Sequence, residues 1–285
     1  MYTAMSKAIY MPKGKAGEYA KYAVNFYVGC SNDCDYCYCK RGLLGHAMGK
    51  PTPTLKKCFK DEDNAVSIFL REMHAHFDEY RKHGLFFSFT TDPLLPETKA
   101  LTYCAIEGAV RNGVPVKILT KRADFIYDDM LLRLTSLHNL IAIGFTLTGC
   151  DELERNASTN AERIHAMEVL HARGFKTFAS IEPVVSIEAA LEVIEASLGI
   201  CDLYKIGLLS GKREYSPDDV FKFKGKVDAM IYANNVRYKE NVKVYWKESV
   251  YEYMYPLATK LHLQIPKSSF EHCVGADYNM FRPLD

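Results

Sequence analysis

The sequence predicts an α/β fold built on a parallel β-sheet. Short apolar runs rich in β-branched and aromatic residues alternate with longer segments of helical periodicity. This alternation is typical of parallel strands joined by right-handed helical crossovers, and strands that are apolar throughout are typical of a sheet covered on both faces. Such a sheet either opens as a doubly wound fold or curls toward a barrel. In both cases the functional site is expected at the carboxyl ends of the strands.

The first half of the chain contains four expected strands. The first covers residues 22–28 and stops at a group of cysteines, and a loop rich in glycine and proline follows over residues 40–60. The helix expected next places Ala65, Phe69 and Met73 on one side. The elements after the loop are expected at 61–83 (helix), 85–90 (strand), 97–112 (helix), 114–119 (strand), 124–137 (helix) and 140–147 (strand).

The second half continues the alternation. A helix to residue 173 is expected to begin at Thr159 or Asn160 as N-cap and to stop at Gly174. A later helix is expected to begin with Ser216 as N-cap and Pro217 at its first position. The other elements are expected at 176–182 (strand), 187–198 (helix), 202–209 (strand), 217–234 (helix), 242–246 (extended) and 248–260 (helix). We expect a single domain over 1–285, with a core at 20–210 and the last helix and a C-terminal extension at 211–285.

The composition excludes several classes of protein. The 285 residues are 48% hydrophobic and 25% charged with a net charge of +1, so no global field attracts nucleic acid or membranes. Nine cysteines, an odd number with a tight cluster, argue against a secreted disulfide framework. No apolar run is long enough to span a membrane, and residues 1–20 lack the apolar segment of a signal peptide. We therefore expect a cytoplasmic protein without a membrane partner.

Three cysteines after the first strand predict a metal centre. Cys30, Cys34 and Cys37 form a CxxxCxxC motif. An iron–sulfur cluster prefers four cysteine ligands, so three local cysteines leave one iron for a substrate or cofactor. The alternative is a structural zinc site, with its fourth ligand from another cysteine or from His46.

The motif resembles that of the radical S-adenosylmethionine (SAM) enzymes, in which an aromatic residue, here Tyr36, precedes the last cysteine. The resemblance implies a partial (β/α)6 radical SAM barrel with the three cysteines after its first strand. It also implies that these cysteines ligate a 4Fe–4S cluster and that SAM binds the fourth iron. Reductive cleavage of SAM would give a 5′-deoxyadenosyl radical that abstracts hydrogen from a substrate. A flavodoxin or ferredoxin is the expected electron donor.

Further segments resemble the spore photoproduct lyase-like (SplB-type) branch of this family. The matching runs are Cys37-Tyr38, residues 89–93, 119–121 and 145–148, and a helix start at 158–166. The resemblance assigns SAM contacts to strand-end hydroxyls and a lysine, and cofactor binding to nearby aromatic and arginine side chains. These cofactor-binding residues are Tyr36, Tyr38, Thr91, Lys121, Thr146 and Arg163.

One position departs from the lyases. They carry a hydrogen-donating cysteine where this chain has Phe89, so the lyase reaction is not expected to follow unchanged. Cys39 is the candidate replacement donor, and a small buried apolar side chain is its alternative role. Glu182, at the end of the fifth strand, is the second candidate catalytic residue; an ordinary ion-paired acid is the alternative. The basic–acidic pair Lys247 and Glu248 is expected to line the far side of the barrel.

A basic loop follows the cysteines and suggests an anionic substrate. It has no acidic residue, and its basic residues are Lys40, Arg41, Lys50, Lys56, Lys57 and Lys60. We expect it over the barrel mouth, where it suits a nucleic acid or nucleotide; a solvated surface loop is the alternative. Three other functions remain open at this point: a radical SAM enzyme acting on a peptide or small metabolite, an iron–sulfur electron-transfer or binding protein that does not cleave SAM, and a zinc-stabilised nucleic-acid binder.

Overall fold

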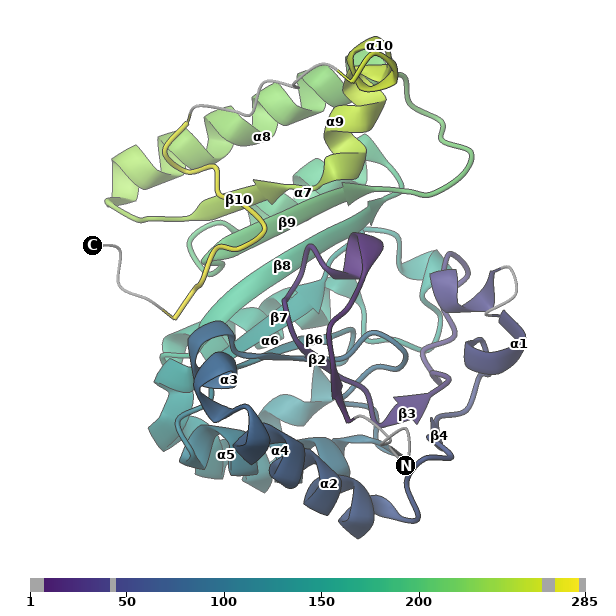
Figure 1. Ribbon diagram of the computed structural model, residues 1–285. Helices are drawn as coiled ribbons and strands as arrows, with labels where there is room; N and C mark the ends of the chain where they lie inside the picture. Colours follow the sequence, from purple (N-terminus) through teal and green to yellow (C-terminus); the bar gives the residue numbers. More distant parts are fainter. Residues whose placement is uncertain (1–7, 42–44, 263–269, 282–285) are drawn as a thin grey trace.

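The centre of the molecule is an eight-stranded sheet (Figure 1). The structure is a computed structural model and describes residues 8–41, 45–262 and 270–281. In spatial order the strands are β1 (Ile9–Tyr10), β2 (Ala23–Val24), β5 (Leu85–Phe87), β6 (Val116–Thr120), β7 (Ile141–Thr146), β8 (Lys176–Val184), β9 (Leu203–Leu208) and β10 (Lys243–Trp246). β1 is antiparallel to β2, and every other neighbouring pair is parallel.

The parallel strands lie side by side in the order of the sequence. There is no reversal of strand order, which a doubly wound sheet requires, so the sheet curls as an open, partial barrel. This confirms the predicted fold class, and the extended run predicted last is a seventh parallel strand, β10. The main helices lie outside the sheet (Figure 1): α2 (Glu62–Ala75), α3 (Phe77–His83), α4 (Lys99–Arg111), α5 (Asp129–Leu134), α6 (Asn160–Ala172), α7 (Ile187–Ser197), α8 (Pro217–Tyr238), α9 (Glu248–Met254) and α10 (Pro256–Lys260).

Two helix starts were predicted correctly. Thr159 is the N-cap of α6 and forms a capping box with Glu162, in which each side chain bonds to the backbone N–H of the other residue. Ser216 and Asp219 form the same arrangement at the start of α8, with Pro217 in the first turn. These reciprocal bonds satisfy backbone donors that have no partner inside the helix.

The first predicted strand, 22–28, is divided in the structure. Residues 23–24 join the sheet as β2, whereas β3 (Tyr27–Val28) pairs with β4 (Thr54–Leu55) in a separate two-stranded sheet. Between them, the Asn25 side chain accepts a 2.7 Å bond from the N–H of Phe89, and Phe26 turns into the core. The predicted loop 40–60 is thus not wholly irregular, because it contains β4 and a short helix, α1 (Gly45–Met48). Residues 42–44 of this loop lie outside the described residues.

Other predicted boundaries also differ. The predicted helix 61–83 is two helices, because His76 has a non-helical backbone (φ −133°, ψ 39°). Over 124–137 only α5 is α-helical, and 3-10 turns flank it. β8 continues through Pro183 to residue 184, where the pairing register with β9 shifts and a missing N–H is tolerated.

Two clusters of apolar side chains fill the molecule. The larger lies between the sheet and its helices and includes Phe69, Ile118 and Ile181. The smaller includes Tyr19, Phe86 and Phe178 together with Met280 from the C-terminal segment. The segment before β2 and the C-terminal segment therefore meet in the smaller cluster.

Candidate functional site

The predicted site residues surround one cavity of about 470 Å³. The cavity lies at the carboxyl ends of the parallel strands, where the fold class places functional sites. Ten of the predicted residues line it: Cys30, Cys34, Tyr36, Cys37, Tyr38, Cys39, Thr91, Lys121, Thr146 and Glu182. The remaining one, Arg163, lies behind the wall.

The cysteine loop is held by its backbone. The N–H of Cys30 donates to the carbonyl of Lys50 at 2.9 Å, and the N–H of Cys37 donates to the carbonyl of Cys34 at 3.3 Å. Gly29 has a φ of +87°, and a β-carbon there would collide with the carbonyl oxygen of Thr52. Only glycine therefore allows the segment before β4 to approach the first cysteine so closely.

The three cysteines are free thiols, of which Cys34 is buried and Cys30 and Cys37 are partly buried. Burial raises the pKa of Cys30 to about 12 and also raises that of Cys34. For Cys37, a hydrogen bond with the Cys39 thiol outweighs burial and lowers the pKa to about 6. Cysteine thiolates are the usual protein ligands of iron–sulfur clusters.

Asp92 ties the cysteine loop to two strands. Its carboxylate accepts from Asn32 Nδ2 at 2.8 Å and from Thr120 Oγ1 at 2.7 Å. It also accepts from the backbone N–H groups of Leu94 and Lys121. Sequence analysis did not assign Asp92 to the site, because an acid before proline is usual turn chemistry.

Two strand ends present polar groups to the cavity beside the cysteines. Thr91 is buried, and its hydroxyl is one of the few buried side-chain groups without a hydrogen-bond partner among the described residues. Burial lowers the pKa of Lys121, but neighbouring Cys34 and Glu154 raise it to a net value above the usual 10.5. The lysine is therefore a fixed positive charge, and the unpartnered hydroxyl is a bonding group that a ligand can satisfy.

Arg163 acts through its neighbours. Its guanidinium is fully buried and donates to the Thr146 carbonyl, to the Glu154 carboxylate and, at 2.8 Å, to the Ser158 carbonyl. Glu154 in turn accepts a hydrogen bond from the Tyr36 hydroxyl. Arg163 therefore fixes the strand end at Thr146 and the ring of Tyr36, which is an indirect role in place of the expected cofactor contact. Glu154 was missed in the sequence because nothing in its spacing distinguishes it.

Phe89 and Cys39 are neighbours in the cavity wall. The Cys39 thiol donates to the Phe89 carbonyl at 3.8 Å, and the Tyr38 hydroxyl donates to the same oxygen. The Phe89 ring stacks on Phe86 with a centroid separation of 4.5 Å. Cys39 is buried but lines the cavity, so the thiol lies beside the residue that replaces the lyase cysteine.

Glu182 belongs to a buried ionic network. Its carboxylate accepts from the Tyr19 hydroxyl and from Lys247 Nζ, both at 2.7 Å. Lys247 is 1% exposed and also lies 3.2 Å from Glu18. Of the predicted pair, Lys247 lines the cavity and Glu248 does not. The carboxylate partners of Lys247 are Glu182 and Glu18. Tyr19 and Glu18 precede the first parallel strand and were missed, because long-range pairs leave no local signal.

The lining of the cavity has an excess of positive charge. Its basic residues are Lys13, Lys15, Lys40, Arg41, Lys50, Lys121 and Lys247, and its acidic ones are Asp33, Asp92 and Glu182. Only the first part of the predicted basic loop contributes. Lys56 instead lies over the Tyr10 ring at 5.8 Å, and Lys57 and Lys60 are exposed away from the cavity.

The family model of the radical SAM superfamily matches residues 24–196. The chain belongs to the radical SAM superfamily. An uncharacterised protein of Methanocaldococcus jannaschii is 26% identical over 175 residues, which are 58% of this chain and 61% of that protein. The chain thus spans less than two thirds of the curated relative's length.

Solved radical SAM structures share the fold. A variant of spore photoproduct lyase with bound AdoMet and dinucleoside spore photoproduct gives a TM-score of 0.53 at 17% identity, covering 75% of this chain and 61% of that one. SuiB of Streptococcus suis bound to S-adenosylmethionine gives 0.55 at 11% identity, covering 79% and 49%. The predicted resemblance to spore photoproduct lyase is thus confirmed at the level of the fold.

Radical SAM proteins use a 4Fe–4S cluster and SAM, and the cavity suits both. Three thiols are available for iron, and the Thr91 hydroxyl and Lys121 ammonium are available for the polar groups of SAM. Within the described residues, no helix is both long and apolar enough to cross a membrane.

Proposed function

We propose that this chain is a radical SAM enzyme whose Cys30, Cys34 and Cys37 hold the cluster. When bound, the cluster and SAM supply a 5′-deoxyadenosyl radical that takes hydrogen from a substrate. The observation that carries the proposal is the convergence of the cysteines, Lys121 and the unpartnered Thr91 hydroxyl on one cavity. A protein that only carries electrons and does not bind SAM does not require Lys121 or the Thr91 hydroxyl beside its cluster.

The residues of the chain have separate tasks in this proposal. Lys121 neutralises the carboxylate of SAM, and the hydroxyls of Thr91 and Thr146 accept or donate hydrogen bonds to its polar groups. Tyr36 and Tyr38 flank Cys37 in the cavity lining and help to exclude water. Cys39 is the proposed hydrogen-atom donor to the substrate radical, and Glu182 is the proposed acid at the substrate end.

We also propose that the chain forms a single domain, because one sheet continues beyond the family match. The family match ends at residue 196, but β9 and β10 continue the same parallel sheet. Residues 20–210 would form the core, and 211–285 would add the last helix and an extension to one domain. A flavodoxin or ferredoxin is the proposed electron donor.

Formation of 5′-deoxyadenosine tests the function. The full chain is reconstituted anaerobically with iron and sulfide and is then mixed with dithionite and SAM. We expect 5′-deoxyadenosine from the unmodified chain and none from Cys34→Ala. The control Cys104→Ala, an exposed cysteine on α4, should keep full activity. An intact cluster that leaves SAM uncleaved would overturn the proposal.

The excess of lysines at the cavity favours an anionic substrate, and we propose a nucleic acid or nucleotide. Lys13 and Lys50 are exposed and line the cavity, so they are the groups best placed to meet phosphates at its mouth. A peptide or small metabolite is the alternative, and it requires no phosphate-binding charges.

Charge reversal tests the substrate class. The pair Lys13→Glu/Lys50→Glu is compared with Lys57→Glu/Lys60→Glu, which changes net charge equally but away from the cavity. Binding of a single-stranded oligonucleotide should weaken in the first pair alone, with the salt dependence of log K falling by about 0.7 for each lost contact. Equal binding by both pairs would favour the peptide or metabolite alternative.

A further inference from the structure

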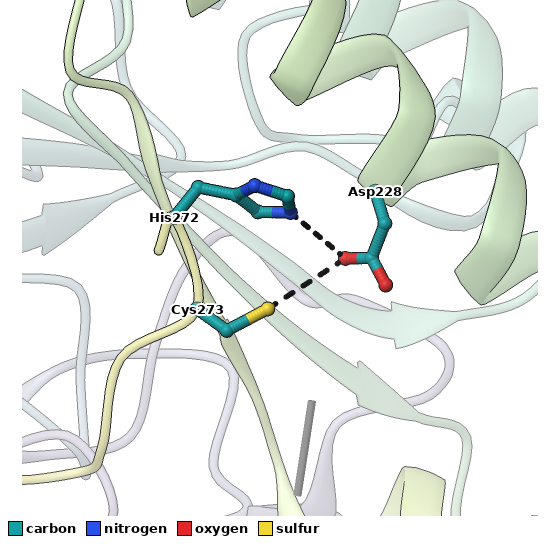
Figure 2. Close-up of side chains that lie close together, drawn as sticks. All are labelled: Asp228, His272 and Cys273. Carbon is teal, nitrogen blue, oxygen red and sulfur yellow. Dashed lines mark hydrogen bonds and ion pairs between the residues drawn. The ribbon is translucent and has the colours of Figure 1, made fainter. Parts of the chain in front are cut away.

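A second group of metal-ligating side chains lies outside the cavity. Asp228 of α8 meets His272 and Cys273 of the C-terminal segment (Figure 2). One ligand atom from each lies within 4.8 Å of the other two. None of the three residues lines the cavity, so the group is separate from the proposed cluster site.

The backbone explains why two consecutive side chains converge. The N–H of Cys273 donates to the carbonyl of Phe270 at 2.9 Å, which closes a turn. Val244 of β10 then bonds on both sides of Cys273, donating to the His272 carbonyl at 2.8 Å and accepting from the Val274 N–H at 2.9 Å. The segment therefore lies along the otherwise open edge of β10, with both side chains directed at Asp228 (Figure 2).

Two of the three ligand separations are close to those around a tetrahedral ion. With zinc bonds of about 2.1 Å to nitrogen or oxygen and about 2.3 Å to sulfur, tetrahedral ligands are separated by about 3.4 Å for N and O and about 3.6 Å for S and O. His272 Nε2 lies 3.3 Å from Asp228 Oδ1, and Cys273 Sγ lies 3.8 Å from the same oxygen. The third pair, His272 Nε2 and Cys273 Sγ, lies within 4.8 Å.

The surroundings hold the carboxylate in the orientation that a ligand needs. Lys224 Nζ binds Oδ2 of Asp228 at 2.6 Å, which leaves Oδ1 directed at His272 and Cys273. Trp246 Nε1 donates to Oδ1 at 3.1 Å and fixes the plane of the carboxylate. Ligating carboxylates in metal sites are commonly oriented by such second hydrogen bonds.

The group of three ligands is buried on the side of Asp228 and His272 and is more exposed on the side of Cys273. Asp228 is 5% exposed and His272 is 4% exposed, whereas Cys273 is only partly buried. An ion can therefore enter from the side of the thiol, and a water molecule can take the fourth position there.

We propose that Asp228 Oδ1, His272 Nε2 and Cys273 Sγ bind a zinc ion that fastens the C-terminal segment to α8 and β10. The oxygen, nitrogen and sulfur donors suit zinc, which accepts all three in four-coordinate sites. On binding, the Cys273 S–H bond breaks, its proton passes to solvent and a sulfur–zinc bond forms. A metal-free ion-pair network of Asp228, Lys224 and His272 is the competing arrangement.

Cobalt(II) binding to a full chain without the cluster cysteines tests the proposal. In the background Cys30→Ser/Cys34→Ser/Cys37→Ser, we expect one cobalt per chain with a sulfur-to-cobalt charge-transfer band. Cys273→Ser should abolish the band, and Asp228→Asn should weaken binding at least tenfold. Cys104→Ser, which changes an exposed cysteine of α4, should keep both the band and the affinity.

A second measurement uses the cluster-containing chain and does not depend on that background. Metal analysis should find one zinc per chain beside the iron of the cluster, and none in Cys273→Ser. Zinc should raise the melting temperature of the unmodified chain and leave that of Cys273→Ser unchanged. Absence of bound zinc and cobalt, or equal binding by Cys273→Ser, would overturn the site in favour of the ion-pair network.

Discussion

Glu182 and Lys247 are 65 residues apart in the sequence, yet their charged groups lie 2.7 Å apart in the cavity wall. The lysine also meets the Glu18 carboxylate and donates to the carbonyl of Lys15 at 3.1 Å. One buried ammonium thus joins β8, the end of β10 and the segment before the first parallel strand. The packing of these three segments in the cavity wall, at the proposed substrate end, depends on the charge of Lys247.

Replacing the lysine should destabilise the fold. Lys247→Met leaves two carboxylates without their shared counter-charge, and we expect a loss of about 3 kcal/mol in the free energy of unfolding. Urea denaturation measures it. The double variant Lys247→Met/Glu182→Gln should recover part of the loss; if it is as unstable as the single variant, the pair does not carry the effect.

Gly207 of β9 makes room for this pair. A β-carbon there would lie 2.8 Å from Glu182 Oε1 and 2.9 Å from Lys247 Cδ. Gly207→Ala should therefore cost about 1–3 kcal/mol by overpacking. The matched control is Gly225→Ala in α8, where nothing lies within 4 Å of the added carbon, and a gain of about 0.5–1 kcal/mol is expected. Thermal denaturation measures both variants. If both substitutions raised the melting temperature, or both lowered it, this explanation would be contradicted.

Thr91→Val should have opposite effects on the free protein and on SAM binding. The buried hydroxyl has no hydrogen-bond partner among the described residues, so its removal should stabilise the cofactor-free chain by about 1 kcal/mol. The same change should weaken SAM binding to the reconstituted protein by about tenfold, because the ligand loses one hydrogen bond. Calorimetry of unfolding and of SAM binding gives both values. Unchanged SAM affinity would remove Thr91 from the binding site.

Lys117 should make stability depend on pH. Burial lowers the pKa of this β6 lysine from 10.5 to about 8, so folding disfavours its charged form. Below about pH 8 the lysine is charged in both states, and Lys117→Met should be more stable than the unmodified chain by about 3 kcal/mol. From about pH 8 to 10.5 the folded chain loses the proton first, so the unmodified chain gains stability and the difference shrinks. Urea denaturation at several pH values measures the difference in stability between Lys117→Met and the unmodified chain. A difference that does not change with pH would refute the assignment of a lowered pKa to Lys117.

The regular part of the fold could be predicted because its signals are local. The capping residues Thr159 and Ser216 mark helix starts, and apolar runs mark buried strands. The division of residues 22–28 could not be predicted, because it depends on the contact of Asn25 with Phe89, far along the chain. Likewise, nothing near His76 predicts the break between α2 and α3.

The site was predictable where a motif or a strand end carried it. The cysteine spacing and the strand-end residues Thr91 and Lys121 pointed to one edge of the sheet, and the cavity lies there. Arg163 was expected to touch the cofactor, but it is enclosed behind Glu154. Such supporting residues owe their place to tertiary packing, which sequence spacing does not encode.

The segment before the first parallel strand also governs when the cavity can form. Its Lys15 carbonyl bonds to Lys247, its Glu18 carboxylate bonds to Tyr245, and its Glu18 carbonyl bonds to Lys205. The sequence separations are 232, 227 and 187 residues. During synthesis this part of the wall leaves the ribosome early but must wait for β9 and β10 before it finds its partners. The cysteine loop is thus synthesised long before this part of the cavity wall can assemble.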